Sequence, residues 1–273
     1  MYKKNIIVTG GTDGIGLSLV KKLIEKDQNV FMIGRNSTKG NNILNSIKSS
    51  NLEFFQCDLS ELHEIKKLLV KLNSIKKIDV LINNAGSIFD KRSLNSQGIE
   101  KTFVLNHLSY FALSLGLIKN LENSPDPRII NVSSNAHKRY KIDINDLENN
   151  INYSGWKAYC RSKLLNIFFT YSFKKEMKTK VKSNCLHPGF VNSNFGNNNK
   201  NFYRFLINIL KNLLAINTNQ AALSPLNLAL NEEFNNTDGK YFFKMKEKKS
   251  SNDTYNEDLA KQVWNKSLEY IKL

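Results

Sequence analysis

The chain has 273 residues, 41% of them hydrophobic and 23% charged, which suits an α/β domain whose core needs no disulfides or structural metal. The net charge of +16 comes from lysines spread along the chain without an RNA-binding motif, so a nucleic-acid partner is disfavoured. Because the three cysteines lack disulfide or metal-site spacing, and no apolar run is long enough for a signal sequence or a transmembrane segment, we expect a soluble, cytoplasmic protein.

The expected elements alternate between strands and helices from Asn5 onward. Leu17–Lys26 and Glu61–Asn73 carry apolar residues at helical spacing, and short runs rich in Ile, Val and Phe lie around them. Right-handed crossovers place connecting helices on both faces of a parallel sheet. The alternation therefore predicts a single, doubly wound α/β domain over residues 1–273, with about seven strands. The expected strands are Asn5–Thr9, Val30–Ile33, Leu52–Gln56, Val80–Asn83, Arg128–Val132, Val181–Leu186 and Lys240–Phe243.

A glycine-rich loop follows the first expected strand. Its glycines have the spacing G-x-x-x-G-x-G and stand directly before a helical pattern. The missing side chains let the backbone turn tightly and approach a pyrophosphate, while the start of the helix offers free N–H groups and the positive end of its dipole. We therefore predict that this loop binds a dinucleotide cofactor. The predicted contacts are Gly10, Thr12, Asp13, Gly14, Ile15 and Gly16.

The end of the second expected strand indicates which dinucleotide is bound. Enzymes that use NAD usually place an acidic residue there, on the ribose 2′-hydroxyl. Here the position is Gly34, and Arg35 follows it. A guanidinium would pair with a 2′-phosphate that a carboxylate would repel. We therefore predict that NADP(H) is preferred, with NAD(H) as the alternative, although the acidic Asp13 in the loop argues the other way.

Five further motifs follow the loop along the chain. They are Cys57-Asp58-Leu59-Ser60, Asn83-Asn84-Ala85-Gly86, Asn131-Val132-Ser133-Ser134, Tyr159-Cys160-Arg161-Ser162-Lys163 and Pro188-Gly189-Phe190-Val191-Asn192-Ser193. Together with the loop they resemble the short-chain dehydrogenase/reductase family, in particular its retinol dehydrogenase-like branch, over nearly the whole chain. The resemblance implies a Rossmann fold and an oxidoreductase that transfers a hydride between NADP(H) and a small-molecule carbonyl or alcohol.

The resemblance also assigns roles to individual residues. Asn106 matches the family's helix asparagine, which holds a water that connects the active-site lysine to solvent. The remaining cofactor contacts implied by the family are Asp58 and Leu59 at the adenine, Asn84, Ala85 and Gly86 at the ribose, and Pro188, Gly189, Val191 and Ser193 at the nicotinamide.

A tyrosine and a lysine on one expected helix suit proton transfer. Hydride addition to a carbonyl leaves negative charge on the oxygen, which needs a proton donor and a polarising hydrogen bond. Tyr159 and Lys163 are spaced i, i+4, so the ammonium can favour the phenolate. By resemblance both residues also contact the cofactor, and Ser134 gives the second hydrogen bond to the substrate. The predicted catalytic set is Asn106, Ser134, Tyr159 and Lys163.

Two segments near the C-terminus depart from the alternation. The first, over about residues 192–218, is expected to form a substrate lid. Its aromatic side chains suggest an apolar substrate, such as a retinoid, a steroid or a lipid-like aldehyde or ketone. The same apolar face could instead contact a membrane surface or a second subunit of a homo-oligomer. The second segment is a tail over about residues 255–273, where apolar residues recur at helical spacing.

The sequence leaves alternative functions open. A catalytically silent NADP(H)-binding scaffold or sensor would use the same loop, but the intact predicted catalytic set argues against it. An epimerase or dehydratase would use the same Tyr-x-x-x-Lys spacing, but the glycine spacing and the short C-terminal region argue against that function. His107, His137 and His187 are interpreted as packing or loop residues, because the mechanism needs no histidine.

Overall fold

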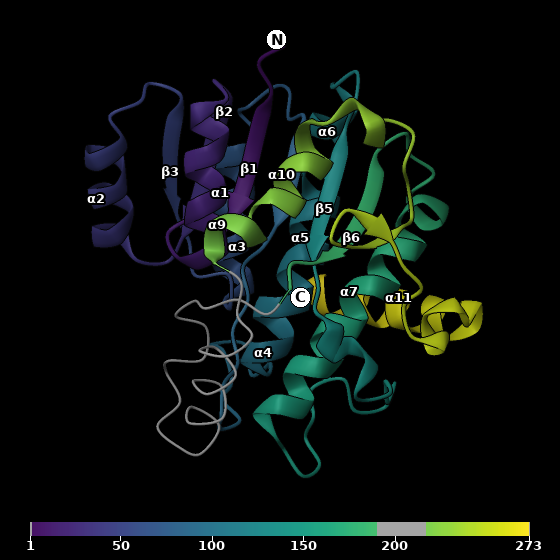
Figure 1. Ribbon diagram of the computed structural model, residues 1–273. Coiled ribbons are helices and arrows are strands. Elements are labelled where there is room, and N and C mark those ends of the chain that lie inside the picture. Colours follow the sequence, from purple (N-terminus) through teal and green to yellow (C-terminus); the bar gives the residue numbers. More distant parts are fainter. Residues whose placement is uncertain (1, 190–216, 273) are drawn as a thin grey trace.

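Within residues 2–189 and 217–272, which the computed structural model describes, eight strands form one central sheet (Figure 1). The order is β3-β2-β1-β4-β5-β6-β7-β8; β1 to β7 are parallel, and β8 is antiparallel to β7. The strands are β1 (Asn5–Thr9), β2 (Asn29–Gly34), β3 (Leu52–Gln56), β4 (Val80–Asn83), β5 (Arg128–Val132), β6 (Lys182–His187), β7 (Tyr241–Phe243) and β8 (Lys246–Glu247). The predicted fold class is confirmed, with strand ends that differ by one residue at β2, β6 and β7.

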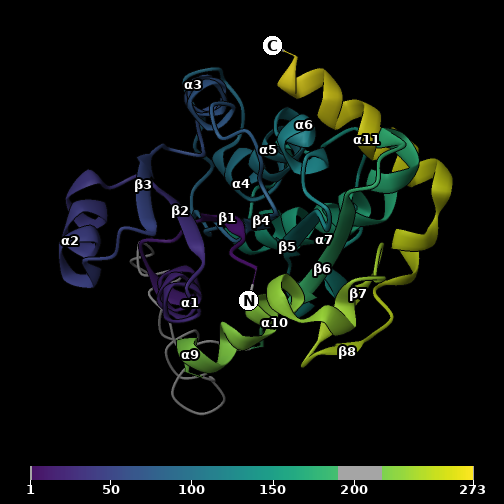
Figure 2. The same ribbon diagram turned by 90° about the horizontal axis from the view of Figure 1, so that it is seen from above.

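Helices cover both faces of the sheet. They are α1 (Gly14–Glu25), α2 (Ser37–Ile47), α3 (Leu62–Leu72), α4 (Lys101–Phe103), α5 (Ser109–Gly116), α6 (Ile118–Glu122), α7 (Gly155–Met177), α9 (Thr218–Ala221), α10 (Leu223–Leu230) and α11 (Glu257–Ile271). Shorter turns are the π-helical η1 (Val104–Leu108) and the 3₁₀ turns η2 (Asn135–Lys138), η3 (Glu232–Phe234) and η4 (Asn252–Tyr255). Figure 2 shows α1, α9 and α10 on one face and α3, α5, α7 and α11 on the other.

The two hydrophobic cores follow from the alternation of side chains along each strand. Ile6 and Val8 on β1 join one core with residues of α1 and α10, and Ile7 between them joins the other core with residues of α3, α5, α7 and α11. Successive residues of a strand point to opposite faces, so a parallel sheet covered twice needs apolar residues at every position. This explains why the strands read as continuous apolar runs.

The strand order reverses between β1 and β4. The chain builds β1, β2 and β3 outward and then returns to place β4 on the other side of β1. Doubly wound sheets bind ligands at such a switch point, outside the carboxyl ends of the strands. The glycine-rich loop after β1 and the Asn83–Gly86 segment at the end of β4 both lie there, at the lower edge of the sheet in Figure 1.

Two of the helices, α1 and α3, agree closely with the two that periodicity predicted. The helix expected over Leu17–Lys26 begins at Gly14, because Asp13 caps it by accepting a hydrogen bond from the Gly14 N–H. The helix expected over Glu61–Asn73 spans Leu62–Leu72. The predicted lid at about 192–218 lies outside the described residues, except for its last two positions.

The tail of the chain forms α11, which packs on α5 and α7. Trp264 is buried, with its ring centroid 4.8 Å from that of Phe111 and 5.9 Å from that of Phe169. Burial of a large aromatic side chain is a main source of helix docking energy. Among the helices that the structure describes, none is both long and apolar enough to span a bilayer.

Candidate active site

The glycine-rich loop is pressed against the segment that follows β4. Gly10 has φ of +66°, and a Cβ there would lie 2.9 Å from Ala85 Cα. A Cβ on Gly16 would lie 2.2 Å from the backbone oxygen of Gly10. Asn84 closes the contact, since its Nδ2 donates to the Thr9 oxygen at 2.9 Å. Side chains are therefore excluded here by the backbone itself, and the start of α1 is held beside the end of β4.

Asp13 is tied to a lysine that the sequence analysis did not single out. One carboxylate oxygen caps α1 at Gly14 N, 2.8 Å away, and the other lies 2.8 Å from Lys39 Nζ on α2. Lys39 comes four residues after Arg35, in the first turn of α2, and this spacing was the available signal. The ion pair offsets the negative charge that argued against a phosphate near Asp13.

The end of β2 has no space for an acidic side chain. A Cβ on Gly34 would lie 2.6 Å from Thr12 Cγ2 and 2.7 Å from Thr12 Oγ1. Thr12, predicted as a cofactor contact, thus fills the position where enzymes specific for NAD carry a carboxylate. Arg35, the next residue, is exposed.

The two residues predicted at the adenine lie after β3. Asp58 forms a turn in which its Oδ1 accepts from the Ser60 N–H at 2.9 Å and from the Ser60 hydroxyl at 2.7 Å. Leu59 is 4% exposed and belongs to the core beneath α3. The structure therefore shows a local, structural role for both residues.

Ser134, Tyr159 and Lys163 come together at the carboxyl end of β5. Tyr159 and Lys163 lie on α7 and are 8% and 3% exposed, and the side chains of Tyr159 and Ser134 share a hydrogen bond. Ser134 Oγ also accepts from the Ala136 N–H at 3.2 Å. The preceding Ser133 donates instead to the Lys163 backbone oxygen at 2.7 Å, so its hydroxyl serves to dock α7.

The charge states of the pair depend on burial. Burial raises the pKa of the Tyr159 phenol, and the hydrogen bond with Ser134 acts in the opposite direction. Burial also lowers the pKa of the Lys163 ammonium to about 8. Lys163 Nζ donates to the Val132 oxygen at 3.0 Å and lies 5.8 Å from the centroid of the Tyr159 ring. Burial therefore keeps Tyr159 protonated at neutral pH, as a general acid requires, and Lys163 is not among the groups that shift the pKa of Tyr159 here, against the expectation from their spacing.

Asn106 lies beside this group, in the π-helical turn η1. Its Oδ1 accepts from the Ser87 N–H at 2.9 Å, and its Nδ2 donates to the Ser87 oxygen at 2.9 Å and to Ser162 Oγ at 3.0 Å. A Cβ on Gly86 would lie 3.2 Å from Lys163 Nζ and 3.3 Å from Asn106 Oδ1. Asn106 thus fastens the segment that passes next to the lysine.

Two histidines fix the loops around the site. His137 Nδ1 donates to the Ser134 backbone oxygen at 2.7 Å, and His137 Nε2 accepts from the Ser251 N–H at 3.2 Å. His187 Nδ1 accepts from the Gly189 N–H at 3.1 Å, which holds the turn at Pro188 and Gly189. The other two residues predicted at the nicotinamide, Val191 and Ser193, lie outside the described residues.

The chain is similar to known dehydrogenases over most of its length. A family model described as short chain dehydrogenase matches residues 4–203. Human polyprenol dehydrogenase is 34% identical, over 96% of this chain and 83% of that protein. Retinol dehydrogenase 12 of Mus musculus is 32% identical, over 98% of this chain and 86% of that protein. Among solved structures, a putative uncharacterized protein from Mycobacterium paratuberculosis gives a TM-score of 0.80 at 23% identity, over 98% of this chain and 93% of that one.

The family match and the order of the motifs agree. Both cover the glycine-rich loop and the Tyr159–Lys163 pair, and the fold places these two features at the same edge of one sheet. The resemblance inferred from the sequence is therefore confirmed. The chain is an oxidoreductase of the short-chain dehydrogenase/reductase family, in its retinol dehydrogenase-like branch.

Proposed function

We propose that the protein transfers a hydride between NADP(H) and an apolar carbonyl or alcohol substrate. The observation that carries this proposal is the grouping of Ser134, Tyr159 and Lys163 at the carboxyl end of β5, at the edge of the sheet that also carries the glycine-rich loop. Bound cofactor would supply the hydride. The three side chains supply the proton and the polarising hydrogen bond that the oxygen needs.

The hydrogen bonds of the site assign a role to each group. Ser134 Oγ accepts from the Ala136 N–H, and its own hydrogen, which it shares with Tyr159 here, can turn to polarise a substrate oxygen. Tyr159 is protonated at neutral pH and donates its phenolic hydrogen to that oxygen. The Lys163 ammonium stabilises the phenolate that remains. In the oxidative direction the same groups act in reverse.

Support for NADP(H) comes from the end of β2. Thr12 leaves no space for a carboxylate at Gly34, and Arg35 is exposed directly after it. Lys39, in the first turn of α2 and paired with Asp13, adds a second cation four residues after Arg35. A 2′-phosphate would gain charge-assisted hydrogen bonds from these groups, and a 2′-hydroxyl would gain less.

Support for an apolar substrate comes from the surroundings of Tyr159 and from the relatives. Ile88, Ala136 and Cys160 are buried around Tyr159, and the Trp156 ring stacks on it with centroids 5.8 Å apart. The relatives are named for polyprenol and retinol, both long apolar alcohols. A cytoplasmic, reducing location is proposed because Cys57, Cys160 and Cys185 are all free and buried.

A panel of carbonyl substrates assayed with NADPH and with NADH tests the function. We expect retinal and polyprenyl aldehydes to be reduced faster than short polar aldehydes, and NADPH to be the better cofactor. Tyr159→Phe should lower kcat by at least about 100-fold, the usual contribution of a general acid, while NADPH still binds. Wild-type turnover by Tyr159→Phe would refute the role of Tyr159, and NADPH binding without any turnover by the wild type would favour a silent scaffold.

A further inference from the structure

A line of buried hydrogen bonds joins α11 to the turn that carries Asn106. Ser267 Oγ on α11 lies 2.9 Å from His107 Nε2, and His107 Nδ1 lies 3.3 Å from Asn166 Oδ1 on α7. Asn166 Nδ2 donates to the backbone oxygen of Asn106 at 2.9 Å. All four residues are 0% exposed. The line therefore runs from the C-terminal helix to a site residue without reaching solvent.

The Asn166 amide sets the direction of these hydrogen bonds. Because its Nδ2 donates to Asn106, the atom that faces His107 is Oδ1, and the ring must donate to it from Nδ1. Burial lowers the pKa of His107 to about 4, so the ring is neutral at physiological pH and its Nε2 is an acceptor. The Ser267 hydroxyl is the donor within reach, and its single hydrogen can be directed either to His107 Nε2 or to the Val263 oxygen, 2.8 Å away.

The turn held by this line is irregular. In η1 the Ser109 N–H donates to the Val104 oxygen, five residues back, so the turn contains one residue more than an α-helix would. Such π-turns are frequent at functional sites and depend on tertiary contacts. Asn106 contacts the segment beside Lys163, whereas its neighbour His107 contacts α7 and α11. Consecutive residues of the turn are thus fastened to the site and to the C-terminal helix.

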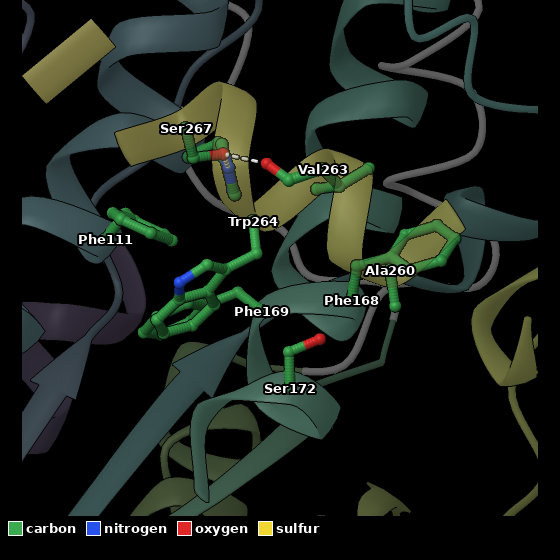
Figure 3. Close-up of a pocket in the computed structure, with 9 residues that line it drawn as sticks. Phe111, Phe168, Phe169, Ser172, Ala260, Val263, Trp264 and Ser267 are labelled. Atoms are coloured by element: carbon green, nitrogen blue, oxygen red, sulfur yellow. Dashed lines mark hydrogen bonds between the residues drawn. The ribbon is translucent and has the colours of Figure 1, made fainter. Parts of the chain in front are cut away.

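Ser267 lies among aromatic side chains of three helices (Figure 3). Phe111 of α5, Phe169 of α7 and Trp264 of α11 pack around it, and the space between these side chains has no room for a water molecule. The space is too thin to hold a ligand. The aromatic side chains hold the helices together, and directional hydrogen bonds fix which polar groups face each other between them. The hydrogen bonds of His107 therefore set the position of η1 against α11.

We propose that His107 is a positioning residue of the active site and that Ser267 on α11 supports it. The inference rests on the proposed function, because it concerns the site built around Tyr159 and Lys163. His107 and Asn166 hold the backbone of η1 from the side of the C-terminal helix. Without them the turn would relax toward regular helix, and the Asn106 amide would move away from Ser87.

A displacement of η1 would affect Lys163 through the neighbouring Gly86. Asn106 holds both the N–H and the oxygen of Ser87, and Gly86 before it lies so close to Lys163 that a Cβ would be 3.2 Å from Nζ. A shift of η1 therefore changes the surroundings of the Lys163 ammonium. The glycine-rich loop, which is held by Asn84 and Thr9, would stay in place. Catalysis should therefore change more than cofactor binding.

Ser267→Ala tests the inference. We expect kcat for carbonyl reduction with NADPH to fall about 10-fold, since small displacements of a reacting group cost up to about 100-fold. The KM values for NADPH and for the carbonyl should stay near those of the wild type. Ser267→Thr keeps the hydroxyl and should restore kcat. Ser172→Ala is the matched control, because Ser172 lines the same space from α7 and lies outside the hydrogen-bond line.

A second variant and a measurement of thermal stability separate positioning from folding. His107→Phe keeps the ring stacked near Phe103 and removes both hydrogen bonds, so kcat should fall at least as far. Thermal unfolding should give similar Tm values for Ser267→Ala and Ser172→Ala. Equal kcat values for these two variants, or a Ser267→Ala defect confined to KM, would overturn the inference.

Failure of the proposed function gives a different result. In that case the wild type reduces no carbonyl, or Tyr159→Phe equals the wild type. The hydrogen-bond line is then tested by amide exchange at the Ser87 N–H, which donates to Asn106. Exchange should be faster in Ser267→Ala than in Ser172→Ala, and equal rates would show that His107 and Ser267 do not position η1.

Discussion

Two cations stand at the end of β2, where a 2′-phosphate would be recognised. Arg35 is exposed, and Lys39 lies 2.8 Å from Asp13. Arg35→Asp should raise the Kd for NADPH about 10- to 100-fold, the equivalent of one charge-assisted hydrogen bond or slightly more, and should change the Kd for NADH little. Fluorescence titration with each dinucleotide measures both constants.

A matched variant separates this local effect from the overall charge. Lys67→Glu makes the same change of two charges at an exposed position of α3, away from the loop after β1. It should leave both Kd values near those of the wild type. Equal losses of NADPH and NADH affinity in Arg35→Asp would contradict a preference for NADP(H).

Among individual residues, the order of the motifs in the sequence identified those whose partners are close to them in the chain. Tyr159 and Lys163 are one turn apart on α7, and the motifs before them gave that spacing its meaning. Lys39 and His107, to which we propose roles at the site, were not singled out for them from the sequence, because their partners are distant: Asp13 is 26 residues from Lys39, and Ser267 is 160 residues from His107. Their roles come from tertiary contacts, which no local pattern encodes.

The C-terminal helix depends on one large side chain for its docking. Trp264 is 4% exposed and packs on Phe111 and Phe169. Trp264→Ala should lower the free energy of unfolding by about 3–5 kcal/mol, because it removes a buried ring and leaves a cavity between α5, α7 and α11. Urea denaturation measures the loss. Val70→Ala on α3, where the side chain is 76% exposed, should change stability by less than about 0.5 kcal/mol. Similar effects of the two variants would show that α11 does not dock through this residue.

Apolar runs and periodicity predicted strands β1 to β7 and helices α1, α3 and α11, and missed the irregular elements. Strands β1 to β7 could be read from their apolar runs because both faces of the sheet are covered. The strand β8 has two exposed residues and gives no such signal. The π-turn η1 was also missed, because its extra residue is held in place by contacts of Asn106 and His107 with distant segments.

The two edges of the sheet carry different polar groups, one for the candidate active site and one for stability. The carboxyl edge carries the candidate active site. At the opposite edge, beside the start of β5, the Asp126 carboxylate forms ion pairs with three cations. These are Arg128 at 2.6 Å, Lys4 at 3.3 Å and Lys182. Arg128 is 2% exposed and also donates to the Leu228 oxygen at 2.7 Å, which ties α10 to the sheet. In a chain with a net charge of +16, this carboxylate offsets concentrated positive charge.

Stability should therefore fall in acid in a way that depends on Asp126. Burial acts to raise the pKa of this carboxyl, but the hydrogen bonds and charges of Arg128 and Lys182 outweigh it and hold the pKa at about 2. An aspartate in the unfolded chain titrates near pH 3.9, so the stabilisation is present above about pH 5 and is lost as the pH falls toward 2. Asp126→Asn should lower the free energy of unfolding at pH 7 by about 1–3 kcal/mol and should weaken its dependence on pH between about 5 and 2.

Urea unfolding at several pH values measures both effects of Asp126→Asn, and kcat with NADPH provides the internal control. Since Asp126 lies at the edge opposite Tyr159, kcat at 25 °C should stay near that of the wild type while stability falls. A large loss of kcat in the folded variant would show that the two edges are coupled. An unchanged acid dependence would mean that other carboxylates dominate acid unfolding and that the pKa of Asp126 lies close to its unfolded value.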